Sequence, residues 1–106
     1  MYEIVLTFNA IIDISSIVDY ISNEIGNPSA AKKVSDVIRL KIESLREYPK
    51  MCPLLDELPY SELGIRKLTI NPFMAYYFAN DDDKKVYVIS VTYQKRDQIS
   101  QLLKLL

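Results

Sequence analysis

The chain has 106 residues, 49% apolar and 25% charged, values typical of one globular domain, which we expect to span residues 1–106. A single cysteine excludes an internal disulfide and a multi-cysteine metal cluster, and the lack of histidine excludes the usual zinc and copper sites and a Ser-His-Asp or Cys-His mechanism. The net charge of −1 hides an excess of bases after Gly64, so one face could still be positive, but this is a weaker electrostatic footprint than a free-standing nucleic-acid binder normally shows.

No apolar run approaches the ~20 residues needed to cross a bilayer, so we expect no membrane partner. The first residues, Met1 to Phe8, include Glu3 and lack both a basic region and a small-residue cleavage site, so no secretory signal is expected. We therefore expect a cytoplasmic protein with no cofactor, no metal and no small-molecule substrate.

A strand and a helix are the first predicted elements. Residues Tyr2 to Thr7 form a short apolar run consistent with a strand at one edge of a sheet, and the sequence leaves open which edge. Apolar residues then recur at spacings of three and four, which places them on one helical stripe: Ile11, Ile14, Val18, Ile21 and Ile25. Gly26 follows as a C-terminal stop for this helix.

A second helix begins at once, because Asn27-Pro28 supplies an N-cap and a first-turn proline. The link is so short that the two helices must form an αα-hairpin. The apolar stripe of the second helix is Ala31, Val34, Ile38, Ile42 and Leu45. Tyr48-Pro49 ends it, since the residue before a proline avoids the helical region. Residues 49–63 contain three prolines and more acids than bases, which predicts an ordered but irregular connection.

Three strand-length segments follow: Leu68 to Ile70, Phe73 to Ala79, and Lys85 to Tyr93. Turn-forming residues link them, so successive hairpins predict an antiparallel three-stranded meander. Asp97 can cap a last short helix whose apolar residues share one side: Ile99, Leu102, Leu103 and Leu106. The expected fold class is therefore α+β, with an N-terminal strand, an αα-hairpin, a three-stranded antiparallel meander and a short C-terminal helix.

The first strand of the meander has two different faces. Alternation places Lys67 and Thr69 on one face and Arg66, Leu68 and Ile70 on the other. If Leu68 and Ile70 face the helices, Lys67 and Thr69 lie on the open face. Beside them we expect an apolar body formed by Met74, Tyr76, Phe78, Val86 and Val88. Such a face usually serves as an interface, for the C-terminal helix, a dimer mate or another protein.

Five local patterns occur in an order that resembles the RelE/ParE superfamily of toxins from bacterial type II toxin–antitoxin modules. They are Leu6 to Ala10 after the first strand, Leu45 to Pro49 after the second helix, Gly64 to Leu68 at the start of the meander, Tyr77-Phe78 in its middle strand, and Tyr93 to Asp97 at its end. Together they cover nearly the whole chain. The superfamily also has the predicted order of elements.

The resemblance implies a plasmid-stabilisation toxin that inhibits growth and is silenced by a cognate antitoxin wrapped over it. RelE-like members act as mRNA interferases on ribosome-bound mRNA, with basic residues on the open sheet face and a residue near the end of the last strand. ParE-like members share the fold, inhibit DNA gyrase and lack that nuclease set. Nuclease-type relatives usually have an arginine where this chain has Met74, which argues against cleavage.

Metal-independent RNA cleavage needs a group that activates the 2′-hydroxyl, a cation for the phosphate and an acid for the leaving oxygen. The catalytic candidates are Tyr93, Lys95 and Arg96, and the target-binding candidates are Arg66 and Lys67. All four bases could instead be solvated charges. The expected antitoxin-binding residues are the apolar ones of the open face: Met74, Tyr76, Phe78, Val86 and Val88. Three hypotheses remain open at this point: an endoribonuclease, a gyrase inhibitor without catalytic activity, and a member that only binds its antitoxin.

Overall fold

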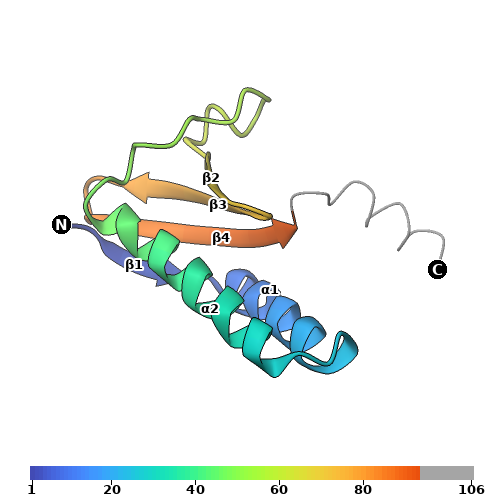
Figure 1. Ribbon diagram of the computed structural model, residues 1–106. Helices are drawn as coiled ribbons and strands as arrows, with labels where there is room; N and C mark the ends of the chain where they lie inside the picture. The colour runs from blue at the N-terminus through green and yellow to red at the C-terminus, as the bar shows by residue number, and fades with distance from the viewer. Residues whose placement is uncertain (94–106) are drawn as a thin grey trace.

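The computed structural model describes residues 1–93, so the expected C-terminal helix and the candidates Lys95 and Arg96 lie outside the described part of the chain. The elements follow in the order β1 (Glu3–Leu6), α1 (Phe8–Asp19), the π-helical turn η1 (Tyr20–Glu24), α2 (Pro28–Glu43), the 3-10 turn η2 (Ser44–Arg46), β2 (Arg66–Ile70), β3 (Phe73–Asn80) and β4 (Lys85–Tyr93) (Figure 1). Among residues 1–93, no helix combines the length and apolar character that a membrane-spanning segment needs.

The four strands form one sheet in the order β1-β4-β3-β2. The predicted meander is confirmed, because β2 pairs antiparallel with β3 and β3 antiparallel with β4. The N-terminal strand joins the β4 edge in parallel, with Glu3 opposite Lys85 and Leu6 opposite Val88. The sheet thus places β1 far from the β2 edge, which the connection after α2 covers through a bridge between Leu54 and Arg66.

The predicted αα-hairpin is also confirmed, and its helix ends follow from local capping. Thr7 caps α1 by accepting a hydrogen bond from the Ala10 amide at 3.2 Å. Asn27 caps α2 by accepting from the Ala30 amide at 3.0 Å, one residue before the first-turn proline. Between the helices, Gly26 has φ +77°, a left-handed conformation that glycine adopts without steric cost.

The apolar stripe predicted for the first helix is only partly correct. Ile14 packs against the core, but Ile11 and Ile25 are 50% and 59% exposed. The residues of α1 that meet the core are Ala10, Ile14 and Ile17. The small Ala10 side chain, fully buried, lets the helix approach β4 closely, and this turns Ile11 away from the core. The stripe predicted for the second helix is buried or partly buried, as expected: Ala31, Val34, Ile38 and Ile42 in α2 and Leu45 in η2.

The core lies between the sheet and the helices, and its largest fully buried side chains are Tyr77, Ile38, Leu45, Val86 and Val88. The expectation that Val86 and Val88 lie on the open face is therefore wrong. The register pairs Val86 with Ala79 and Val88 with Tyr77, so these residues point toward the helices. The error arose because the sequence does not give the β3–β4 register, and a shift of one residue moves every side chain to the other face.

Candidate functional site

The open face of the sheet is the side of β2, β3 and β4 that the helices do not cover. Lys67 lies opposite Tyr76 and Thr69 opposite Met74, so the expected outward position of both β2 residues is confirmed. The outward residues of these strands are Lys67, Thr69, Met74, Tyr76, Phe78, Asn80, Lys85, Tyr87, Ser90 and Thr92. Phe78 and Tyr87 stack with ring centroids 5.1 Å apart. The face therefore carries two cations, Lys67 and Lys85, beside aromatic and small polar side chains, and Lys85 Nζ lies 3.9 Å from Glu3 Oε2.

Tyr87 and Ser90 were missed by the sequence reasoning, and a bulge in β4 explains part of the difficulty. Tyr76 pairs with Ser90 but Tyr77 pairs with Val88, so Ile89 is an extra residue on β4. Alternation counted from the predicted start of the strand separates Tyr87 from Val86 and Val88, but only the β3–β4 register shows which of these sets points outward. Alternation could not have placed Ser90, because the bulge changes the alternation after Val88.

Polar side chains from the start of α1 hold this bulge. The Ile89 carbonyl accepts hydrogen bonds from Thr7 Oγ1 at 2.9 Å and Asn9 Nδ2 at 3.2 Å. The Val91 amide donates to Asp13 Oδ2 at 3.0 Å. Since β1 ends where the bulge begins, these side chains replace a neighbouring strand along the second half of β4. They fix the part of β4 that presents Ser90 on the open face.

The irregular segment between η2 and β2, called the connection below, lies beside the open face. Together they form a groove of about 640 Å³, here called the loop–sheet groove. Its apolar walls are Leu55, Tyr60, Leu63 and Ile65 from the connection and Tyr76 and Ile89 from the sheet. Its polar lining is Asp56, Glu57, Lys67 and Ser90. The groove thus lies where this irregular segment meets the open face.

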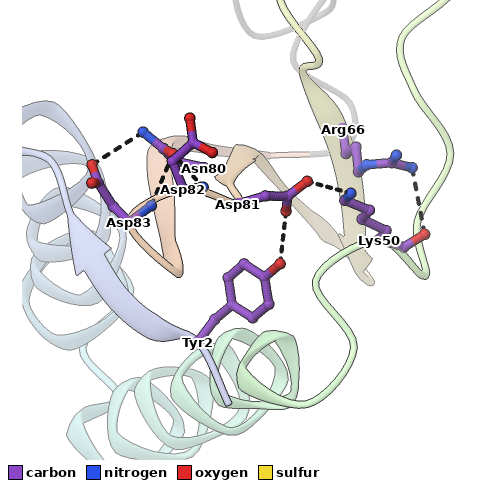
Figure 2. Close-up of polar contacts among 7 residues, drawn as sticks. All are labelled: Tyr2, Lys50, Arg66, Asn80, Asp81, Asp82 and Asp83. Atoms are coloured by element: carbon purple, nitrogen blue, oxygen red, sulfur yellow. Dashed lines mark hydrogen bonds and ion pairs between the residues drawn. The ribbon is translucent and has the colours of Figure 1, made fainter.

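Arg66 holds the wall of this groove in place. Its Nη1 donates to the Cys52 carbonyl at 2.6 Å. It also donates, more weakly, to the Lys50 carbonyl at 3.4 Å (Figure 2). Backbone bonds continue the attachment: the Leu55 amide donates to the Ile65 carbonyl at 2.9 Å. The guanidinium is therefore engaged with main-chain carbonyls of the connection.

A second cluster fixes the base of the connection. Lys50 Nζ lies 2.6 Å from Asp81 Oδ2, and the Tyr2 hydroxyl donates to Asp81 Oδ1 at 2.7 Å (Figure 2). The hydrogen bond from Lys50 lowers the pKa of Asp81, and the bond to Asp81 raises the pKa of Tyr2. Asp82 and Asp83 form a turn in which their backbone amides donate hydrogen bonds to the Asn80 side-chain oxygen. Within residues 1–93, no three cysteine, aspartate or glutamate side chains gather closely enough to hold a metal ion.

The described candidates for catalysis and target binding do not meet. Lys67 lies on the open face, whereas Arg66, opposite the buried Tyr77, points to the other side and to the connection. Tyr93 lies opposite the buried Phe73 and contacts its ring edge to face, with centroids 5.7 Å apart. Tyr93 thus lies beside the start of β3 and Arg66 beside its middle, and neither shares the face of Lys67.

Comparison with known proteins identifies the family. A family model described as "ParE toxin of type II toxin-antitoxin system, parDE" matches residues 4–98. The chain belongs to this ParE toxin family. The resemblance to the RelE/ParE superfamily inferred from the sequence is therefore confirmed. The comparison with curated proteins found no match.

Solved structures of related toxins share the fold of this ParE-family chain. The chromosomal ParDE toxin–antitoxin system from P. aeruginosa matches with a TM-score of 0.71 and 24% identity over 88% of this chain and 96% of that one. The intact E. coli RelBE toxin–antitoxin complex matches with a TM-score of 0.63 and 18% identity over 88% and 96%. The isolated E. coli RelE toxin matches with a TM-score of 0.64 and 18% identity over 98% and 97%. Because both ParE and RelE structures match, the fold alone does not separate the two mechanisms.

Proposed function

We propose that this ParE-family toxin arrests growth by binding a protein target without cleaving RNA. DNA gyrase is the target that the ParE-like resemblance implies. A cognate antitoxin neutralises the toxin by covering the open face. The observation that carries the proposal is the separation of Lys67, on the open face, from Arg66 and Tyr93, which lie on the other side of the sheet.

RNA cleavage requires a base, a cation and an acid around one phosphate, because a misplacement of about 1 Å can already cost a large part of the rate. On the open face, the cations of the described strands are Lys67, whose cross-strand neighbour is Tyr76, and Lys85, which is paired with Glu3 at 3.9 Å. Met74, which stands where nuclease-type relatives have an arginine, adds no charge. Two carboxylates, Asp56 and Glu57, line the groove that Lys67 also lines, and they repel a phosphate backbone.

The chemistry of the rest of the face favours a protein ligand. Met74, Tyr76 and Phe78 are partly buried side chains on the side of the sheet that no described helix covers. Aromatic residues and methionine are enriched at protein interfaces. The similar P. aeruginosa and E. coli structures are those of toxin–antitoxin systems, which supports an antitoxin segment as the occupant. Val86 and Val88 take no part in this interface, because both are in the core.

Expression of the chain from an inducible promoter tests the proposal. We expect growth arrest, a DNA damage response, inhibition of supercoiling by purified gyrase, and relief when the adjacent reading frame is co-expressed. Primer extension on mRNA from the same cells is expected to show no codon-phased cuts. Continued growth at the normal rate without any antitoxin would contradict the toxin assignment, and codon-phased cuts with normal gyrase would contradict the mechanism.

The alternative is a ribosome-dependent mRNA endoribonuclease, and the position of Tyr93 is what favours it. Tyr93 is 37% exposed at the end of the last strand, where the resemblance places a nuclease residue, and Lys95 and Arg96 follow it in sequence. If induced cells do contain cut mRNA, this alternative requires that Tyr93→Phe or Arg96→Ala abolish the cuts.

A further inference from the structure

The loop–sheet groove has the size and the lining of a site for side chains of a partner. Its volume of about 640 Å³ falls within the roughly 300–1,000 Å³ of pockets that enclose ligands. Leu63 and Tyr60 line it and still remain 63% and 47% exposed. Apolar side chains that line a groove and stay in water indicate an interface more strongly than scattered ones.

The charges of the groove are unusual for a toxin that would bind nucleic acid. Asp56 and Glu57 contribute two negative charges and Lys67 one positive charge, and Glu62 lies in the same segment of the connection. Among residues 1–93, the ion pairs are those of Glu43 with Arg46, Asp81 with Lys50 and Glu3 with Lys85, so Asp56 and Glu57 form no ion pair with a described base, and Lys67 offsets only one of their two negative charges. An apolar groove with excess negative charge is complementary to an aliphatic segment that carries a cation.

The wall of the groove is ordered before any partner arrives. The Ser61 amide donates to the Glu57 carbonyl at 3.0 Å, and the Ile65 amide donates to the Tyr60 carbonyl at 3.1 Å. Gly64 has φ +74° and turns the chain back toward β2. Because this wall needs little ordering, less of the interaction free energy is lost on binding.

We infer that the loop–sheet groove binds an apolar segment of the cognate antitoxin that carries a lysine or arginine. The aliphatic stem of that residue packs on Leu63 and Tyr76, and its charge faces Asp56 and Glu57. This inference rests on the proposed pairing with an antitoxin. It adds the chemical character of the antitoxin segment and the toxin residues that select it.

A charge-swap experiment tests the inference. The probe is the full-length product of the adjacent reading frame that relieves growth arrest, and the measurement is its affinity for the purified chain by calorimetry at low and high salt. The double variant Asp56→Lys/Glu57→Lys is expected to bind at least about tenfold more weakly than wild type, because close charge pairs at interfaces couple this strongly. The matched control Asp82→Lys/Asp83→Lys makes the same change of charge on the exposed β3–β4 turn and is expected to stay within about twofold.

A second pair of variants keeps the test valid if the charge reversal disturbs folding. Asp56→Asn/Glu57→Gln preserves side-chain size and is expected to weaken binding in the same direction by a smaller factor. Lysine or arginine to glutamate changes along the antitoxin should include one that restores binding to the charge-swapped toxin.

The outcomes separate this inference from the proposed function. If the antitoxin binds wild type and the charge-swapped variant equally, the groove inference is wrong and the toxin–antitoxin pairing stands. If no product of an adjacent frame binds wild type, both fail. A short single-stranded RNA that shifts the NMR signals of Leu55 and Ile89 would also overturn the inference, since it would show that the groove accepts phosphate.

Discussion

Replacing Arg66 with alanine distinguishes a structural role from a role in target binding. The change removes a charged donor 2.6 Å from the Cys52 carbonyl, in a part-buried position next to the buried Cys52 side chain. A hydrogen bond from a charged group contributes about 1.5–3 kcal/mol net to the free energy of unfolding, and the bond at 3.4 Å to Lys50 adds little. We therefore expect Arg66→Ala to lower the free energy of unfolding by about 1.5–3 kcal/mol.

Lys67→Ala is the matched control, because it removes a base from the adjacent residue, whose side chain makes no hydrogen bond within residues 1–93. Its expected effect is within about 0.5 kcal/mol. Urea unfolding followed by circular dichroism gives both values, and a thermal scan should show a fall of about 4–8 °C per kcal/mol for a domain of this size.

The reasoning about Arg66 is refuted by one pattern of results. If Arg66→Ala unfolds at the same urea concentration as wild type and has nevertheless lost toxicity, Arg66 contacts the target and the connection is held by its backbone bonds alone. If stability falls as expected, Arg66 has the structural role, and a loss of toxicity in this variant needs no contact of Arg66 with the target to explain it.

Three further predictions concern the buried position of Val88, the bond from Asp13 at the β4 bulge, and the ion pair of Asp81. Val88→Ala should lower the free energy of unfolding, measured in urea, by about 2 kcal/mol, because it leaves a cavity in the core. Phe78→Ala on the open face should lower this free energy less and weaken antitoxin binding more. The reverse order would show that Val88 lies on the open face. Asp13→Ala should cost about 1–3 kcal/mol and speed hydrogen exchange of the Val91 amide, and unchanged exchange at that amide would show that the bond is dispensable. Because the pKa of Asp81 is lowered in the folded state, its carboxylate stabilises the fold at pH values above its ordinary pKa of 3.8. This stabilisation is lost as the pH falls through the lower pKa of the folded state. Acid unfolding should therefore depend less on pH in Asp81→Asn than in wild type, and identical profiles would contradict the ion pair.

The sequence predicted the elements well wherever one local signal decides them. Asn27-Pro28 and Gly26 marked the helix ends because capping and φ preferences act within a few residues. The meander was predictable because each of its links is turn chemistry. Lys67 was placed on the open face correctly, since Leu68 and Ile70 fixed the alternation of a short, regular strand.

The failures arise where long-range pairing decides the outcome. Val86 and Val88 were assigned to the wrong face because the β3–β4 register and the bulge at Ile89 depend on Thr7, Asn9 and Asp13, which are about 80 residues away in sequence. The groove was not predicted at all. Its wall depends on the contact of Arg66 with the Cys52 carbonyl, and no local pattern in a proline-rich connection indicates such a contact.

Arg66 and Lys67 are adjacent in one motif, but they lie on opposite sides of the sheet, so their positions bear on the mechanism more than the motif does. Gly64 to Leu68 resembles a superfamily pattern, and its two cations would be read together as one basic patch. Alternation along β2 instead sends Arg66 to the connection and Lys67 to the open face, where Asp56 and Glu57 line the same groove. Of the two cations in this motif, only Lys67 is on the open face, and the two groove carboxylates partly balance its charge. A face with this charge distribution and with stacked Phe78 and Tyr87 is better suited to a protein surface than to RNA.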